Sequence, residues 1–384
     1  MKRAVYIHEY SIACALGENV NAVRRNLLSP APRAVAGEAR VPGGRIVPAG
    51  AIAFALDGEG TRSNRLADHC LSSLKPAIAQ LIEAVGPKRV GVVVGTSTSG
   101  VREAGEVFRT RIADGRWPSD YRFAVQELGD TAAHVAKRTG ALGPAYGIST
   151  ACTSGAKALA SAARLIEAGL CDAAIAGGID ALCDLTLAGF ASLESLSDTV
   201  CNPFSVNRRG INLGEGGALF VLSAQPSAIR LAGWGESADA YHMSAPDPEG
   251  KGAEAAMLGA LSRAAATAAD IGYINLHGTA TKLNDAMEAR AISRLFGAEV
   301  HCSSTKPMTG HMLGAAGACE AAFTLMALEA GRLPAHLWDG EYDPELPPIR
   351  LVAAQGETAD IRRAMSCSYA FGGNNIALVL EKAA

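Results

Sequence analysis

The chain has 384 residues, of which 49% are hydrophobic and 5% aromatic, and its formal net charge is −3. This balance offers no basic excess for nucleic acid or for an anionic membrane surface, so we expect neither as a partner. Nine cysteines without a Cys-x-x-Cys pair argue against a disulfide framework and a zinc site, and favour reduced thiols in the cytoplasm.

Strand-like and helix-like segments alternate along the chain, which predicts a layered α/β fold. The first apolar run is broken by His8 and Glu9, too early for a signal peptide, and predicts an N-terminal strand instead. No uninterrupted apolar stretch has the length of a transmembrane helix. Further strands are expected over Arg89–Gly95, Ala145–Ser149, Ala173–Gly177, Ala218–Leu222, Gly272–Leu276, Val300–Ser303, Ala364–Ala370 and Asn375–Glu381. Helices are expected over Thr61–Val85, Thr131–Thr139, Ala156–Leu170, Glu254–Ala268, Asp285–Phe296 and Ala315–Gly331.

The element order suggests that the chain is built from two similar halves. Pro226 and Ser227 lie in a break between segments of similar strand and helix content. Each half closes on a pair of strands, 173–177 with 218–222 and 364–370 with 375–381. We therefore expect a duplicated architecture with halves at 1–224 and 225–384.

Cys152 lies where an apolar strand turns into an Ala-rich helix. Unpaired backbone N–H groups and the helix dipole favour a thiolate at such a helix start. The small neighbours Ala151 and Gly155 leave room for a substrate to approach. The local pattern suits a nucleophile, although a buried structural cysteine would show the same pattern.

A histidine motif, His277-Gly-Thr-Ala-Thr281, follows directly after an apolar strand. The C-terminal ends of strands are the usual place for active-site groups in open α/β sheets. The hydroxyls of Thr279 and Thr281 suit a polar ligand. A single histidine in this position would also be compatible with a structural role.

A second motif begins at Ser303, places Lys306 just after a strand, and places His311 before an apolar helix that carries Glu320. A histidine at a helix start tends to stay neutral and can donate a hydrogen bond to a developing oxyanion. Lys306 and Glu320 would form a buried ion pair that orients His311. Read alone, the lysine fits an ordinary surface charge equally well.

A third motif runs from Ser368 to Asn375 between two apolar strands. Gly372 and Gly373 permit a turn with positive φ, or a backbone N–H directed at a ligand. A plain β-hairpin is the alternative interpretation of this segment.

Together these motifs resemble those of the β-ketoacyl-acyl-carrier-protein synthases of the I/II type, in the thiolase-like superfamily. The resemblance extends over most of the chain and implies a duplicated thiolase-like fold, layered α-β-α-β-α with two mixed sheets. It rests on Thr150-Ala151-Cys152, His277-Gly278-Thr279, Lys306 to Glu320 and Phe371-Gly372-Gly373, and also on Asn202-Pro203-Phe204, Arg208 to Gly216 and Asp239 to Met243.

The resemblance implies a decarboxylating Claisen condensation. Cys152 would accept an acyl group from acyl carrier protein as a thioester. His277 and His311 would promote decarboxylation of a malonyl thioester by donating hydrogen bonds to the enolate oxygen, and the carbanion would then attack the thioester. The product is a β-ketoacyl chain two carbons longer, and the backbone N–H groups of Cys152 and Phe371 would form the oxyanion hole.

Supporting roles follow from the same resemblance. Lys306 and Glu320 match the family's polar pair, and Phe371 matches its gating aromatic residue. Substrate-binding positions are expected at Thr98, Ser244, Thr279, Thr281, Gly372 and Gly373. We expect no metal and no diffusible cofactor, because the phosphopantetheine arm arrives attached to the carrier protein.

Some positions depart from the family pattern. Lys282 stands where proline is common, and Asn374 stands where threonine is common. The polar loop 95–100 replaces an apolar residue, near Thr98, that shapes the acyl pocket of housekeeping enzymes. We therefore hypothesise a specialised pathway, such as aryl-polyene or polyketide-like chain extension, with its own acyl preference.

Three other functions share parts of this pattern. A non-catalytic partner subunit of a ketosynthase heterodimer typically lacks the nucleophile, which Cys152 supplies here. A degradative thiolase lacks the Lys306–His311 motif, and a cysteine hydrolase would leave the second histidine unexplained.

Partners also follow from the resemblance. The family is dimeric, so we expect a homodimer or a heterodimer with a paralogous subunit, in addition to acyl carrier protein. Carrier docking needs a basic patch, for which the candidates are Arg24, Arg25, Arg62, Arg65, Arg208 and Arg209.

Overall fold

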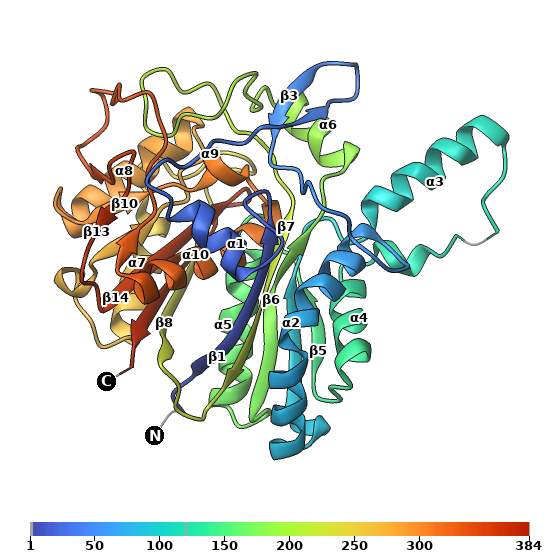
Figure 1. Cartoon of the computed structure of the whole chain (residues 1–384). Coiled ribbons are helices and arrows are strands. Elements are labelled where there is room, and N and C mark those ends of the chain that lie inside the picture. Colours follow the sequence, from blue (N-terminus) through green and yellow to red (C-terminus); the bar gives the residue numbers. More distant parts are fainter. Residues whose placement is uncertain (1–2, 120, 384) are drawn as a thin grey trace.

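The first half of the chain forms a five-stranded mixed sheet in a computed structural model that describes residues 3–119 and 121–383 (Figure 1). Its strands lie in the order β5-β4-β6-β7-β1. β1 is antiparallel to β7 and β7 to β6, whereas β6, β4 and β5 are mutually parallel. The strands are β1 (Tyr6–Cys14), β4 (Val90–Gly95), β5 (Ala145–Ile148), β6 (Ala173–Asp180) and β7 (Gly216–Ser223).

The second half repeats this arrangement strand for strand. Its order is β10-β9-β14-β15-β8, with the short β12 added at the β10 edge. β8 is antiparallel to β15 and β15 to β14, whereas β14, β9 and β10 are parallel. The strands are β8 (Ile229–Ala238), β9 (Tyr273–Asn275), β10 (His301–Ser303), β12 (Arg350–Leu351), β14 (Arg363–Ala370) and β15 (Asn374–Lys382). The expected duplication of the architecture is confirmed.

The two sheets are joined rather than separate. Tyr6 and Ile7 of β1 pair with Arg230 and Ile229 of β8, which makes one sheet of eleven strands within the described residues. The N-terminal strand is longer than the apolar run suggested, because a bulge between Ile7 and Glu9 accommodates the polar residue between them.

Two helices, α5 (Ser154–Glu167) and α10 (Ala316–Ala330), form the middle layer (Figure 1). They contact each other and strands of both halves. Of the 15 residues of α10, 13 are buried, which explains why this helix is apolar on every side. The segment Leu313–Ala330 has the length and mean hydropathy, 1.3, of a membrane span, but Glu320 and Glu329 interrupt it, so it is not an uninterrupted apolar stretch. Because 89% of it is buried inside the fold, it serves as a core helix.

The outer layers cover the two remaining faces. α2 and α4 pack on the strands of the first half, and α7, with α8 beside it, packs on β8 and β15 of the second half. These helices span α2 (Arg62–Val85), α4 (Asp130–Thr139), α7 (Lys251–Arg263) and α8 (Lys282–Phe296). The other elements are α1 (Val20–Leu27), β2 (Gly37–Arg40), β3 (Ile46–Ala49), α3 (Val101–Asp114), α6 (Asp184–Ser192), α9 (Lys306–Thr309), β11 (Arg332–Leu333) and β13 (Glu357–Thr358).

All nine strands and all six helices that the sequence predicts are present, with ends that differ by a few residues. β8, α1, α3 and α6 were not expected. Of these, α3 extends away from the main body of the molecule (Figure 1).

Candidate active site

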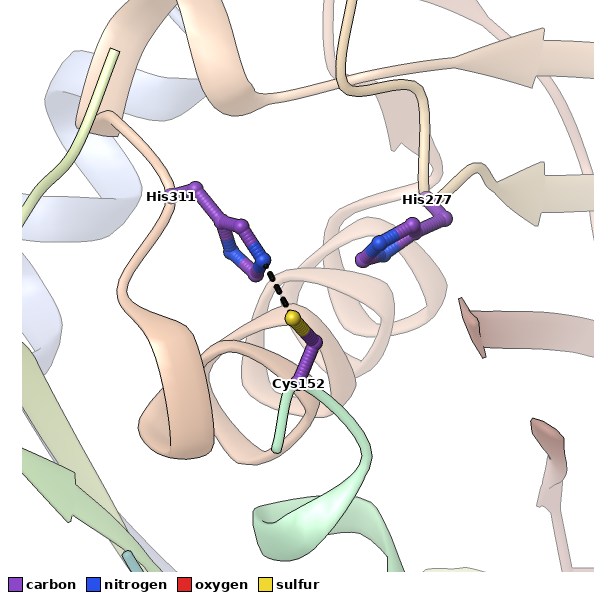
Figure 2. Close-up of side chains that lie close together, drawn as sticks. All are labelled: Cys152, His277 and His311. Carbon is purple, nitrogen blue, oxygen red and sulfur yellow. Dashed lines mark hydrogen bonds between the residues drawn. The ribbon is translucent and has the colours of Figure 1, made fainter. Parts of the chain in front are cut away.

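A sharp turn between β5 and α5 presents Cys152. Ala151, the residue before it, has a φ of +52°, in the left-handed region that costs a residue with a side chain about 1–2 kcal/mol. Two hydrogen bonds close the turn, because Thr150 N–H donates to Ser154 Oγ (2.9 Å) and that hydroxyl donates to the Ala151 carbonyl (2.6 Å). Strained backbone of this kind persists only where its surroundings hold it, and here it directs the thiol toward the two histidines (Figure 2).

Cys152, His277 and His311 come together as the sequence predicted. His311 Nε2 lies 2.9 Å from Cys152 Sγ. The rings of His277 and His311 meet edge to face, with centroids 5.2 Å apart (Figure 2). All three side chains are buried, and all three line one cavity of about 410 Å³.

Cys152 and His311 occupy equivalent places in the two halves. Each lies in the link between the third strand of its half (β5 or β10) and the middle-layer helix (α5 or α10). The starts of these helices approach closely at two glycines. A Cβ on Gly155 would lie 2.9 Å from the Cβ of Ala318, and a Cβ on Gly317 would lie 2.8 Å from that of Ala156. Because no side chain separates the helices there, the thiol and the imidazole can meet.

Lys306 and Glu320 form a buried ion pair beneath the histidines. The Lys306 ammonium donates to Glu320 and to the backbone carbonyl of His277, and it lies 3.4 Å from His277 Nδ1. An ammonium group can only donate, so Nδ1 of His277 is the acceptor and Nε2 carries the proton. The pair therefore orients His277, not His311 as we expected from the sequence.

Burial sets the protonation state of all three groups. It lowers the pKa of His277 and of His311 well below the usual value, and the nearby Lys306 cation adds to the effect. Both histidines are therefore neutral, as predicted for His311, although the larger cause is desolvation rather than the helix dipole. Burial also raises the pKa of the Cys152 thiol, and Lys306 only partly opposes this. This direction opposes the thiolate that the helix start favours, and a thiol needs a proton acceptor.

Two carboxylates that the sequence analysis did not assign hold the His277 loop. Glu288 accepts hydrogen bonds from the backbone N–H groups of His277 and Gly278, at 2.7 Å each. Asp285, one turn earlier on α8, accepts from the N–H groups of Phe204 and Ala280 at 2.8 and 3.1 Å. Two acids three residues apart on a helix that follows a catalytic motif share one face, and that spacing was the available signal.

Thr98 does not lie where the resemblance placed it. It is 1% exposed, is absent from the cavity lining, and its hydroxyl donates to Asp180 at 2.7 Å. The same buried carboxylate accepts from the Thr96 hydroxyl and from the N–H of Gly314. The polar loop 95–100 thus satisfies Asp180 internally and links β6 to the segment after His311.

Most of the other predicted substrate positions surround the cavity. Ser244, Thr279 and Thr281 line it, and the two threonine hydroxyls are 2.9 Å apart. Phe371 also lines it and stacks on Phe190 of α6 with ring centroids 5.6 Å apart. Gly372 and Gly373 form the turn beside it with φ of +82° and +74°, without lining the cavity themselves.

The six candidate arginines do not form one patch. Arg62 pairs with the buried Glu215, Arg208 with Asp343, and Arg24 with Glu329. Of the six, Arg208 and Arg209 line the cavity, and Arg209 is exposed there together with Lys282. Arg209 and Lys282 are therefore the cations that an approaching macromolecule would meet at the mouth.

Comparison with known proteins covers most of the chain. Residues 77–228 match the family model described as beta-ketoacyl synthase, N-terminal domain, and residues 229–338 match the model of its C-terminal domain. The 3-oxoacyl-[acyl-carrier-protein] synthase 2 of Staphylococcus aureus is 33% identical over 347 residues, which cover 84% of this chain and 83% of that protein. Nodulation protein E of Rhizobium meliloti is 35% identical over 307 residues, 77% of this chain and 76% of that protein.

A solved structure matches over nearly the whole length. It is the ketosynthase ApeO in complex with its chain length factor ApeC, from Xenorhabdus doucetiae. One of its chains superimposes with a TM-score of 0.94 and 42% identity, over 99% of this chain and 98% of that one. This agreement confirms the expected duplicated thiolase-like fold.

Proposed function

The chain belongs to the β-ketoacyl synthase family and is a condensing acyltransferase, and we propose that Cys152 carries the acyl group while His277 and His311 drive decarboxylation. The observation that supports these roles is the convergence of a thiol and two neutral imidazoles in one buried cavity. The product of this condensation is a β-ketoacyl thioester, two carbons longer than the acyl group loaded on Cys152.

The first step is acyl transfer from the carrier. Because burial raises the pKa of the Cys152 thiol, the sulfur needs a proton acceptor, and His311 Nε2 is 2.9 Å away. The sulfur attacks the carrier thioester, the new S–C bond forms, and the pantetheine sulfur leaves with the proton. The acyl group then remains on Cys152.

The second step is loss of CO₂ from a malonyl thioester. The bond between the carboxylate and the α-carbon breaks, and its electrons move into an enolate. Two neutral imidazoles donate to the enolate oxygen. His277 donates through the Nε2 proton that Lys306 fixes there, and His311 donates in the tautomer that carries its proton on Nε2. The enolate carbon then attacks the Cys152 thioester, the C–C bond forms, and the cysteine sulfur leaves. We assign the oxyanion hole to the backbone N–H groups of Cys152 and Phe371.

The mouth of the cavity suits a tethered substrate. Thr279, Thr281 and Ser244 offer hydroxyl groups along the wall for the amide-rich phosphopantetheine arm, and Arg209 and Lys282 face outward for an acidic carrier protein.

We infer that the reaction itself uses no metal and no diffusible cofactor, since neutral hydrogen-bond donors supply the stabilisation that decarboxylation needs. The nine cysteines are all free thiols, which supports a cytoplasmic location.

A paralogous subunit is the partner we propose, by analogy with ApeO and its chain length factor. Two features support it. One is the segment 101–117, which contains α3 and extends from the main body (Figure 1), and the other is the outer edge of β5, which pairs on one side only within the described residues. The segment 101–117 exposes Phe108 (46%), Ile112 (83%) and Trp117 (49%), and exposed apolar groups of this kind mark interaction surfaces. The specialised pathway stays a hypothesis, and the similarity to a ketosynthase that works with a chain length factor is the finding that favours it. The polar loop 95–100 no longer supports it, because the hydroxyls of Thr96 and Thr98 donate to Asp180. The boundary between the two halves is proposed at residues 224/225, between the end of β7 and the start of β8.

Intact-mass analysis after incubation with a panel of acyl carriers tests the proposal. We expect an acyl adduct on the wild-type protein and none on Cys152→Ala. His277→Ala should still form the adduct but release little CO₂ from malonyl carrier. An adduct of equal yield on Cys152→Ala would show that the nucleophile lies elsewhere, and would reopen the possibility of a non-catalytic subunit.

A further inference from the structure

Lys157 is a half-buried cation on α5 with no acidic side chain within 4 Å of its nitrogen in the described part of the chain. Its Nζ instead lies 2.8 Å from the side-chain amide of Asn374. Because an ammonium group only donates, the amide atom that faces it is the oxygen. A single neutral acceptor does not compensate an ammonium group for partial loss of its hydration. The stability of the fold therefore does not explain why a lysine stands here.

Asn374 closes the turn that carries Phe371. It pairs with Ala370 across β14 and β15, so only Phe371, Gly372 and Gly373 lie between the paired residues. The contact from Lys157 therefore holds the base of this turn from the side of α5.

A second set of contacts holds the same turn from the opposite side. Gly372 N–H donates to the Met243 carbonyl, and Asp239 N–H donates to the Gly373 carbonyl, both at 2.8 Å. A Cβ on Gly373 would lie 2.9 Å from the Cβ of Asp239, so this approach is close. The turn is thus clamped between the 239–243 loop and the helix that begins just after Cys152.

Burial has an electrostatic cost at Lys157. It lowers the pKa of the ammonium group, and Glu236 only partly offsets this, since that carboxylate is already paired with Arg164 at 2.6 Å. An apolar side chain of the same length would avoid this cost. A lysine occupies this position despite that cost, which points to a function for its contact with Asn374.

We propose that Lys157 is a positioning residue that fixes the Phe371 turn to the nucleophile helix through Asn374. The proposal rests on the function assigned above, in which the N–H groups of Cys152 and Phe371 form the oxyanion hole. These two donors come from separate halves of the chain. The Lys157–Asn374 contact ties the second donor to the same helix that fixes the first, and so restricts the distance between the two donors when the Phe371 turn is in the position seen here.

Replacement of Asn374 by threonine tests the reach of this contact. A threonine hydroxyl is nearer the backbone than the asparagine Oδ1 and would not span the same gap to Lys157 Nζ. The lysine and the asparagine therefore form a matched pair in this chain.

The test uses the full-length enzyme, together with its partner subunit where one is required, and the variants Lys157→Met, Lys157→Arg and Asn374→Thr. Lys75→Met, a substitution of an exposed lysine on α2, is the control. Three rates are measured for each variant: acyl loading on Cys152, condensation, and release of CO₂ from malonyl carrier by the acyl-free enzyme. The oxyanion hole serves the first two reactions, whereas decarboxylation depends on the histidines.

We expect Lys157→Met and Asn374→Thr each to lower the loading and condensation rates about tenfold, a fraction of the ~100- to 1,000-fold that a lost oxyanion donor costs. CO₂ release should be unchanged, KM for the carrier should be unchanged, and the melting temperature of Lys157→Met should be equal or higher. Lys157→Arg should recover most of the rate, and the double variant should be no slower than either single variant.

Two results would overturn the proposal. One is an unchanged loading rate in Lys157→Met. The other is a parallel fall of all three rates with a lower melting temperature, which would mark a merely structural lysine. If the wild-type protein itself acquires no acyl group on Cys152, the proposed function fails instead, and the two failures are thereby separated.

Discussion

Replacement of Lys306 by methionine should separate stability from catalysis at the buried ion pair. The substitution removes the cation that contacts Glu320, the only one among the described residues, and it leaves that carboxylate in the core with one oxygen already unpartnered. Breaking a buried pair in this way costs about 3–5 kcal/mol of unfolding free energy. It also frees Nδ1 of His277, so the ring can place its proton on either nitrogen.

Urea denaturation and CO₂ release provide the two readouts. Lys306→Met should lose about 3–5 kcal/mol, and a second change, Glu320→Leu, should restore most of that loss by removing the unpaired charge. Decarboxylation should stay at least ~100-fold below wild type in both variants, because neither one fixes the tautomer of His277. Recovery of CO₂ release along with stability in the double variant would refute the assignment of Lys306 to tautomer control.

Three further predictions concern other parts of the molecule. Burial lowers the pKa of His336 to about 4, so its contribution to stability is fully present above about pH 6.5 and is lost as pH falls through 4. His336→Gln should therefore show a shallower fall of unfolding free energy over this range in urea titrations, and an identical slope would contradict the argument. Gly317→Val should weaken folding by several kcal/mol and should abolish loading, since even a Cβ would lie 2.8 Å from that of Ala156; a melting temperature equal to wild type would contradict this. Lys282→Glu with Arg209→Glu should raise KM for the carrier protein several-fold with little change in kcat, an effect that high salt should shrink, and an unchanged KM would exclude this rim as the docking site.

The sequence predicts much of the fold, because the strands of this protein are apolar runs between turn residues. It did not predict β8 (Ile229–Ala238), which begins beside the Pro226 break and contains two glycines, so that it has neither a continuous apolar run nor clear alternation. α3 was equally hard to see, because its apolar residues face outward and no core-facing stripe marks the helix.

The candidate site was predictable where a motif carries its own chemistry, as at Cys152, His277 and His311. What could not be predicted were contacts made between distant segments. No residue near Thr98 in the sequence indicates that its side chain lies outside the cavity, because its partner Asp180 is 82 residues away. The orientation of Lys306 toward His277 rather than His311 depends on the strand order, which sets β9 beside β10.

The equivalent placement of Cys152 and His311 bears on how such an enzyme could arise. Two copies of one ancestral unit, paired about a two-fold axis, would bring the same link face to face with itself, and both positions would carry the same residue. Fusion of the copies into a single gene removes that restriction. One link can then become a nucleophile while its counterpart becomes the proton acceptor. The chemistry of this site is in that sense a product of broken symmetry, and neither half by itself holds a complete catalytic set.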